Sequence, residues 1–269
     1  MDDARAANDY WGRAGLDRAI VDALTAAGKD LSALTVDDLA PADQFHGGGK
    51  PATERLARLA GLTPGLRVLD VGGGLGGAAR TLAAQFGCSV TLVDLTESYV
   101  SAGRVLTALV DLEDHVTHQL GNALALRDDG NPYDVVWTQN SGMNIEDKAR
   151  LYSGFSRMLR PGGILALQEP MAGPGGPPVF PLMWARDASA SFLLPPDQMR
   201  ALIERSGFRL RAWDDVTVET GKAGGAVPPH SIQRIVMGEA LDAITRAGQR
   251  NRDEGRIVMI QAVFERLER

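Results

Sequence analysis

The sequence predicts an α/β protein with a seven-stranded, mostly parallel sheet and helices on both of its faces. Three observations lead to this prediction. Segments of strand length alternate with amphipathic segments of helix length beyond residue 60. A glycine-rich stretch, RVLDVGGGLGGAAR at Arg67–Arg80, joins the first strand to the helix after it. The chain has 269 residues and 44% hydrophobic content, which suits one decorated α/β domain or two small ones.

Residues 1–60 predict a helical segment that precedes the sheet. Apolar residues recur there at helical spacing, at Leu16, Ile20 and Leu24 and again at Leu56 and Leu59. Glycines end both stretches, as is common at helix C-termini. Between them lies the glycine patch Gln44–Thr53. We expect this N-terminal part to form a lid over the ligand-binding edge of the sheet.

Residues 61–269 predict the sheet and its helices, in alternation. Strands are expected where β-branched and aliphatic residues run together or alternate, at 68–71, 89–94, 115–120, 133–139, 163–169, 208–216 and 256–264. Helices are expected where apolar residues lie three and four apart, from the glycine loop to Gly87 and at Thr96–Asp111, Asp147–Leu159, Asp197–Gly207 and Ile232–Arg252. Asp197 is the predicted cap of its helix.

Two stretches interrupt this alternation. They lie near residues 171–196 and 219–255, and the second begins with the Pro/Gly-rich segment Glu219–His230. Both follow strand ends on the side where open α/β sheets bind ligands. We expect them to cap a substrate pocket.

Composition narrows the class of partner. The net charge of −6 disfavours nucleic acid, whose binding surfaces are usually basic. The acidic start shows no secretory signal, and no apolar run approaches the roughly 20 residues of a membrane span. One cysteine and four scattered histidines indicate no metal site. We therefore expect a soluble, cytoplasmic protein that binds a small molecule, with homo-oligomerisation left open.

The glycine loop predicts a Rossmann-like ligand site. Gly72, Gly74 and Gly77 match G-x-G-x-x-G between a strand and a helix, a pattern that is weak by itself. Asp70 lies within the strand end, where it would repel a diphosphate and attract a cation. Asp94 ends the next strand, where a carboxylate can accept hydrogen bonds from ribose hydroxyls. The expected ligand therefore carries a ribose and a cationic group.

These residues resemble the first motif of class I S-adenosylmethionine (SAM)-dependent methyltransferases. VLDVGGGLGG, LVDLT, GNALAL and LRPGGILALQEP match the motifs of that family in order, over about Asp43 to Val218. In detail, DQFHGGG, LTESYV and WTQNSGMNI are similar to bacterial small-molecule enzymes of the sarcosine/dimethylglycine N-methyltransferase and ubiquinone-methyltransferase-like groups. The resemblance implies methyl transfer to a small acceptor of natural-product or amine metabolism, within a methyltransferase core at 61–269.

The resemblance also implies the cofactor site. SAM, which becomes S-adenosylhomocysteine (SAH), would be held by Gln44, Asp70, Gly72, Gly73, Gly74, Asp94, Leu95, Asn122, Ala123 and Gln139. Asp94 would bind the ribose, and Gln139 would lie under the methionine portion. Asn122 stands where the family usually has an acidic residue, so its side-chain carbonyl must accept from the adenine amino group.

Substrate residues are expected after the fourth and fifth strands and in the first insertion, at Asn140, Met143, Asn144, Glu169 and Trp184. Glu169 would orient a polar substrate, or instead bond Arg186 or a backbone amide. Trp184 fits a lid or a core equally well. His46 is the candidate general base, and a loop histidine bonded to backbone is an equal alternative.

Two other functions stay open at this point. A protein of the same fold could bind SAM or SAH and catalyse a cyclisation or pericyclic reaction without methyl transfer. An NAD(P)-dependent oxidoreductase is the other alternative, which Asp70 and the LRPGG turn disfavour.

Overall fold

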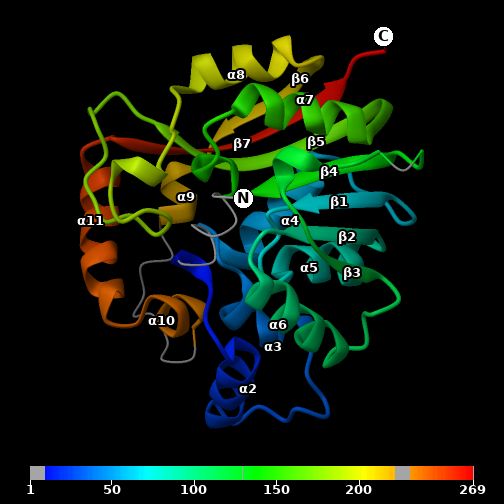
Figure 1. The fold of residues 1–269 in the computed structure, drawn as a ribbon, viewed down its shortest axis with the longest axis vertical. Helices are drawn as coiled ribbons and strands as arrows, with labels where there is room; N and C mark the ends of the chain where they lie inside the picture. The colour runs from blue at the N-terminus through cyan, green and yellow to red at the C-terminus, as the bar shows by residue number, and fades with distance from the viewer. Residues whose placement is uncertain (1–9, 129, 222–230, 269) are drawn as a thin grey trace.

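The computed structural model describes residues 10–128, 130–221 and 231–268, and its centre is one seven-stranded sheet (Figure 1). The strand order is β3-β2-β1-β4-β5-β7-β6. The strands are β1 Arg67–Val71, β2 Ser89–Asp94, β3 Val116–Leu120, β4 Tyr133–Gln139, β5 Leu159–Ala172, β6 Phe208–Asp215 and β7 Ile257–Arg266. Neighbours from β3 to β5 are parallel, whereas β7 runs antiparallel to both β5 and β6. The predicted fold class is confirmed.

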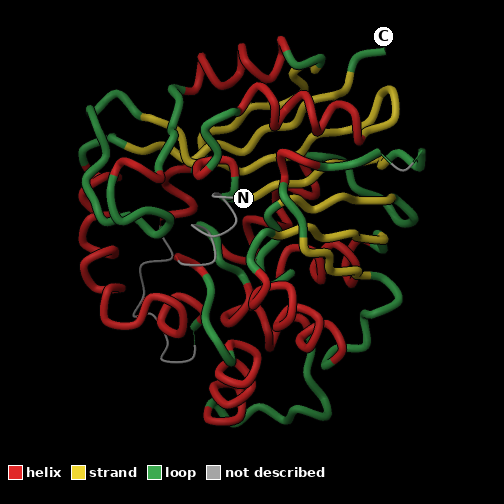
Figure 2. The backbone as a smooth tube through the Cα atoms, viewed as in Figure 1, coloured by secondary structure: helices red, strands yellow, loops and turns green. Residues whose placement is uncertain are grey.

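Helices surround this sheet, and further helices lie beyond the carboxyl ends of its parallel strands (Figure 2). The α-helices are α2 Leu16–Ala26, α3 Val36–Asp43, α4 Gly49–Leu59, α5 Gly77–Phe86, α6 Glu97–Ala108, α7 Lys148–Met158, α8 Pro196–Arg205, α9 Thr217–Gly221, α10 Ile232–Met237 and α11 Leu241–Asp253. Short 3₁₀ turns are η1 Ala123–Ala125, η2 Gly142–Asn144, η3 Ala188–Ala190 and η4 Gly238–Ala240.

Three apolar clusters hold the layers together. On one face of the sheet, α4 and α5 pack Leu56 and Leu82 against Trp137 of β4. On the other face, α7 and α8 bury Phe155 and Ile203 against the strands around β5. The third cluster joins α2, α3 and α10 to α6, away from the sheet, and it contains the predicted core residues Leu16, Ile20 and Leu24.

The strand order places a crevice at the carboxyl end of β1. From β1 the chain proceeds outward through β2 and β3, and then crosses back to β4 on the other side of β1. Helices therefore leave the carboxyl ends of β1 and β4 toward opposite faces, which opens a space between them. The glycine loop that follows β1 and the turn that follows β4 both border it.

Two predicted helix boundaries are wrong. The single helix expected at Ile232–Arg252 is broken, because Gly238 has φ 52° and ψ −131°, which no α-helix can include. Asp197 does not cap α8. Its N-cap is Pro195, and Pro196, whose fixed φ suits the first helical position, begins the helix.

In the described ranges, no helix combines the length and apolarity that a membrane crossing requires. The predicted cap near 219–255 is only partly described, because most of its Pro/Gly-rich segment, residues 222–230 with His230, lies outside the described residues.

Candidate active site

A cavity of about 1410 Å³ lies at the carboxyl ends of β1, β2 and β4. Every predicted cofactor residue lines it, as do four of the predicted substrate residues and His46. Those residues are Gln44, His46, Asp70, Gly72, Gly73, Gly74, Asp94, Leu95, Asn122, Ala123, Gln139, Asn140, Met143, Asn144 and Trp184. Glu169 is the predicted site residue that is not part of the lining. A pocket for one drug-sized ligand has about 300–1,000 Å³, so this cavity has room for two molecules.

The glycine loop is shaped by close packing as much as by its ligand. Gly72 has φ 73°, and a Cβ there would lie 2.3 Å from the Ser141 Cβ. Several of its amides are used within the protein: Gly72 N donates to Val93 O (2.8 Å), and Gly74 N donates to Asp94 Oδ2 (2.9 Å). A diphosphate needs such amides free, so this loop suits a ligand without one.

Asp70 presents a buried acceptor with no partner among the described residues. The residue is 1% exposed, and its Oδ2 accepts no hydrogen bond there. Burial, together with the nearby negative charge of Asp94, raises the pKa of Asp70 to about 8. A cationic group placed beside this carboxyl would reverse that shift.

Gln139 presents the complementary group, a buried donor. Its Oε1 accepts from Trp137 Nε1 and from Thr53 Oγ1, both at 3.0 Å. The indole N–H can only donate, so Oε1 is held toward it and the Nε2 amino group is held away. Among the described residues that buried Nε2 has no partner. The site therefore offers an unsatisfied donor as well as an unsatisfied acceptor.

Asp94 and Asn122 are partly engaged by their own loops. Asp94 Oδ1 accepts from Thr96 N (2.8 Å) and its Oδ2 accepts from Gly74 N, while burial raises the pKa of the carboxyl. Asn122 Oδ1 accepts from Leu124 N (2.8 Å) at the start of η1. Asp94 also accepts from the Leu95 amide and the Thr96 hydroxyl, so its oxygens are largely engaged, whereas Asn122 Oδ1 keeps a second lone pair for a ligand.

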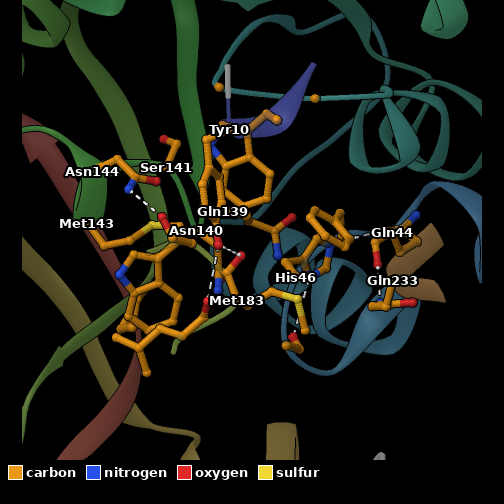
Figure 3. Close-up of a pocket in the computed structure, with 18 of the residues that line it drawn as sticks. Tyr10, Gln44, His46, Gln139, Asn140, Ser141, Met143, Asn144, Met183 and Gln233 are labelled. Carbon is orange, nitrogen blue, oxygen red and sulfur yellow. Dashed lines mark hydrogen bonds between the residues drawn. The ribbon is translucent and has the colours of Figure 1, made fainter. Parts of the chain in front are cut away.

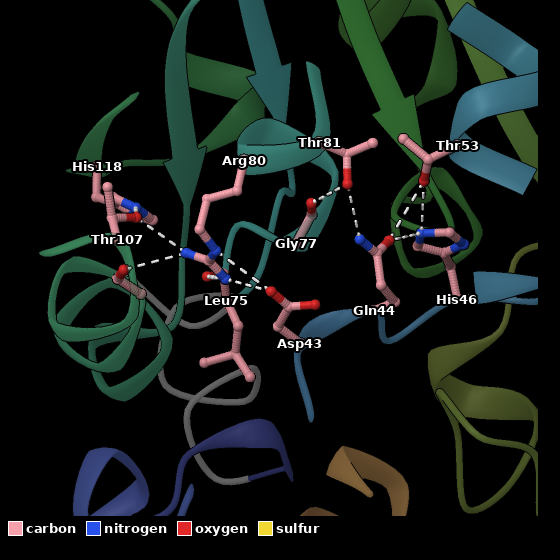
Figure 4. Close-up of polar contacts among 11 residues, drawn as sticks. Asp43, Gln44, His46, Thr53, Leu75, Gly77, Arg80, Thr81, Thr107 and His118 are labelled. Carbon is pink, nitrogen blue, oxygen red and sulfur yellow. Dashed lines mark hydrogen bonds and ion pairs between the residues drawn. The ribbon is translucent and has the colours of Figure 1, made fainter. Parts of the chain in front are cut away.

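His46 lies in a hydrogen-bonded network that joins the lid to α4 and α5 (Figure 4). Its Nε2 lies 2.8 Å from Gln44 Oε1 and 3.1 Å from Thr53 Oγ1, and its Nδ1 lies 3.3 Å from Gly47 O. Burial lowers the pKa of His46 to about 4, so the ring is neutral at pH 7. Both ring nitrogens therefore face protein atoms, and catalysis by His46 stays a prediction.

A buried ion pair anchors the lid beside the glycine loop. Arg80 of α5 and Asp43 at the end of α3 are fully buried, with Nη2 2.8 Å from Oδ2. Arg80 also donates to Leu75 O (2.8 Å) and Thr107 Oγ1 (2.9 Å). His118 contacts the same hydroxyl, and burial lowers its pKa to about 3 (Figure 4). The pair therefore links the lid, the loop and α6.

The far end of the cavity is mostly apolar (Figure 3). Met143 and Trp184 belong to one buried cluster with Leu182, and Met183 packs against them. Asn144 Nδ2 donates to Trp184 O (3.0 Å), which ties the turn after β4 to the first insertion. Trp184 thus serves both as packing and as cavity wall.

Glu169 of β5 contacts the turn after β4 and does not line the cavity. It is fully buried, and its Oε1 accepts from Gly142 N (2.8 Å) and Ser141 N (3.2 Å). Lys148 Nζ donates to the carbonyls of Gly142 (2.8 Å) and Ile145 (2.7 Å) in the same turn. Of the roles considered for Glu169, the structure shows the bond to backbone amides, and the side chain holds the turn that carries the cavity residues.

The sequence did not predict the aromatic residues near the N-terminus that line the cavity, nor the buried side-chain amides of Gln168 and Gln261. Tyr10 and Trp11 line the cavity, and the Trp11 ring lies 5.5 Å from Phe45 and 6.4 Å from Tyr99. Two adjacent aromatic residues in the polar stretch NDYWGR were the available signal. Ser141, Met183 and Gln233 also line the cavity without having been predicted (Figure 3).

Known proteins resemble this chain in sequence and in fold. Residues 68–163 match the family model described as a methyltransferase domain. The chain is 33% identical to glycine/sarcosine/dimethylglycine N-methyltransferase of Actinopolyspora halophila over 49% of its length, but spans only 23% of that protein. It is 29% identical to methyltransferase GfsG of Streptomyces halstedii, over 72% of this chain and 69% of that one.

Among solved structures, geranyl diphosphate C-methyltransferase from Streptomyces coelicolor A3(2), in complex with SAH, superposes with a TM-score of 0.67. The sequences are 20% identical, and the match covers 81% of this chain and 77% of that one. At this identity the likeness shows a shared fold.

Proposed function

We propose that this chain, whose residues 68–163 match the model of a methyltransferase domain, is a class I SAM-dependent methyltransferase that transfers a methyl group from SAM to a small organic acceptor. One observation carries the proposal. A buried acceptor at Asp70 and a buried donor at Gln139, each without a partner among the described residues, face one cavity. An α-amino acid group, with its ammonium and its carboxylate, satisfies both.

The remaining residues fit the rest of the cofactor. Asp70 would hold the methionine ammonium, and Gln139 Nε2 would donate to the carboxylate. Asp94 would accept from the ribose hydroxyls at the carboxyl end of β2, and Asn122 with Ala123 would border the adenine. When bound, SAM supplies a methyl group on a positively charged sulfur, which is a good leaving group.

The residues of the chain would then mainly position the reactants and exclude water. Transfer of that methyl group would require the acceptor atom to lie in line with the bond between the methyl carbon and sulfur. The turn after β4 and the Trp184 wall would hold the acceptor in line with that bond, and the lid with Trp11 would cover it. Alignment of this kind supplies much of the rate of such reactions.

The acceptor in this proposal is a small molecule of natural-product or amine metabolism, the protein acts in the cytoplasm, and no nucleic acid or membrane partner takes part. The name of the similar glycine/sarcosine/dimethylglycine N-methyltransferase supports a small-molecule acceptor. The net charge of −6 supports the absence of a nucleic acid partner.

Binding of SAH tests the proposal directly. We expect calorimetry to show SAH binding and no binding of NADH. Asp94→Ala should weaken SAH binding by about 30-fold or more, because hydrogen bonds to a charged group contribute roughly 1.5–3 kcal/mol each. Asp94→Asn, which keeps one acceptor oxygen, should lose less, and the exposed Asp114→Ala should lose nothing. Tight NADH binding without SAH binding would disprove the proposal.

His46→Ala should lower turnover more than it lowers SAH affinity. The ring fixes Gln44 and Thr53, and His46 and Gln44 both line the cavity, so loss of the ring should disturb the alignment of the acceptor. Turnover is measured as SAH formed with the first acceptor found in a small-molecule screen, and affinity by calorimetry. Because the pKa of His46 is about 4, the rate should not change through this group between pH 6 and pH 8. Unchanged turnover in His46→Ala would remove it from catalysis.

A further inference from the structure

A chain of three side-chain amides runs from the surface to the cavity. Arg55 Nη1 donates to Gln261 Oε1 (2.5 Å), and Gln261 Nε2 donates to Gln168 Oε1 (2.8 Å). Gln168 Nε2 then donates to Asn140 Oδ1 (3.2 Å) and to Gly47 O (2.9 Å). Gln168 and Gln261 are fully buried, and Asn140 lines the cavity.

The hydrogen bonds of this series of amides all run in one direction, from donor at the surface to acceptor at the cavity. A guanidinium has donors and no acceptor, so Gln261 must turn its oxygen toward Arg55 and its amino group toward Gln168. Gln168 must then do the same toward Asn140. The backbone carbonyls of Ala52 and Gly47 accept the second hydrogens of the two glutamines and reinforce that direction. If the Asn140 amide were flipped, its amino group would face the amino group of Gln168, and no hydrogen bond could form. The Asn140 oxygen is therefore held toward Gln168.

The Asn140 amino group is therefore left for the cavity. Within the described part of the chain, Asn140 Nδ2 donates no hydrogen bond, whereas Oδ1 accepts one from Gln168. The backbone holds the residue in place as well, since Asn140 N donates to Gln168 O (2.8 Å) and its φ is 52°. Asparagine tolerates this left-handed conformation better than most residues. Figure 3 shows Asn140 between Gln139 and the wall around Met143.

We propose that Asn140 Nδ2 is the hydrogen-bond donor that orients the acceptor substrate, and that this acceptor carries an oxygen, as a hydroxyl, enol or carbonyl, next to its reacting atom. The proposal rests on the proposed function, because it places the acceptor beside the cofactor. A protonated amine has only N–H donors to offer and would meet the N–H donors of Asn140. The site thus selects oxygen-bearing acceptors over ammonium groups.

The test uses small probes on the protein saturated with SAH. Acetophenone, ethylbenzene and benzylamine share an aromatic body and differ in the polar group, and their affinities are measured by NMR titration. Wild-type protein should bind acetophenone about 3- to 10-fold more tightly than ethylbenzene, the range for one neutral hydrogen bond. Acetophenone should also shift one side-chain amide signal in ¹H–¹⁵N spectra, and that signal should be missing in Asn140→Asp.

Two variants and a control sharpen the result. Asn140→Gly suits the positive φ and removes the amide, so acetophenone should lose its advantage while ethylbenzene is unchanged. Asn140→Asp should invert the order, with benzylamine now bound more tightly than acetophenone. Gln119→Glu, on the exposed side of β3, should leave the order as in wild type.

The failures of the two proposals are distinguishable. If wild-type protein does not bind SAH, the proposed function fails, and this inference falls with it. If SAH binds and acetophenone has no advantage over ethylbenzene, or Asn140→Asp leaves the order unchanged, the assignment of Asn140 is overturned while the proposed function stands.

Discussion

Asp70→Asn should abolish high-affinity SAH binding and at the same time stabilise the free protein at pH 8. The carboxylate is expected to hold the methionine ammonium, and a neutral amide cannot replace that charge. A hundredfold or greater loss of affinity in calorimetry is expected, consistent with about 3 kcal/mol for a buried charge-assisted hydrogen bond. In the free protein, however, the carboxyl is buried with Oδ2 unpartnered among the described residues, so ionising it costs free energy.

The gain in stability has a defined pH window. The pKa of Asp70 is raised from 3.8 to about 8 by burial and by Asp94, so the folded state binds a proton that the unfolded state has released. Stability is therefore lost as pH rises from about 4 to about 8. Asp70→Asn should remove this loss, with a gain of roughly 2 kcal/mol or more at pH 8 and little at pH 4. Denaturant melts at both pH values measure it, with the exposed Asp114→Asn as control.

The same shift couples cofactor binding to proton release. An ammonium beside Asp70 favours the carboxylate, so SAH binding near pH 7 should release close to one proton. Calorimetry in two buffers with different ionisation enthalpies counts that proton. Equal SAH affinity in Asp70→Asn and wild type would contradict this role of Asp70.

Arg80→Met should destabilise the fold by about 3–5 kcal/mol, the range for a buried ion pair that loses one partner. Methionine fills much of the volume but leaves the fully buried Asp43 carboxylate without its partner. It also leaves Leu75 O and Thr107 Oγ1 without their donor. Denaturant unfolding at pH 7 gives the free energy of unfolding.

A double variant and a surface control identify the cause. Asp43→Leu combined with Arg80→Met removes both charges and should recover a large part of the loss. Arg209→Met breaks the exposed pair with Glu265 and should cost less than about 1 kcal/mol. A loss below 1 kcal/mol in Arg80→Met would show that the pair does not hold the lid.

The sheet and the residues that line the cavity at the carboxyl ends of β1 and β2 could be predicted because their signals are local. The strands are apolar runs or segments in which apolar and polar residues alternate, and Asp70 and the loop glycines lie within a few residues of one another. The parallel order of β1 and β2 then brings Asp94 to the same edge. Spacing along the chain was sufficient for these residues.

The contacts that set side-chain direction could not be predicted, because they join residues far apart in the chain. Gln168 and Gln261 are 93 positions apart and meet only because β7 pairs with β5. Asp43 and Arg80 are 37 positions apart. Glu169 lies near the carboxyl end of β5, yet its side chain accepts from backbone amides of the turn after β4 and does not line the cavity, and no periodicity distinguishes the two directions.

The broken helix near Gly238 shows a different limit. Its apolar positions Ile232, Ile235 and Val236 lie three and four apart as on one helix face, and Ile232 and Val236 are buried. A glycine inside a helix is only about 1 kcal/mol less favourable than an alanine. Packing can therefore decide whether the helix continues through the glycine or ends at it. The tertiary structure selects the break.

The late position of β7 in the chain has a consequence for biosynthesis. This strand lies between β5 and β6, so a nascent polypeptide that has emerged from the ribosome only as far as α11 has an open gap in its sheet. Gln261 enters with the same strand and sets the direction of the amides that end at Asn140. Most of β7 must therefore be synthesised before this series of amide hydrogen bonds can form, and if Asn140 has the proposed role, we expect incomplete chains not to bind the acceptor in the wild-type orientation.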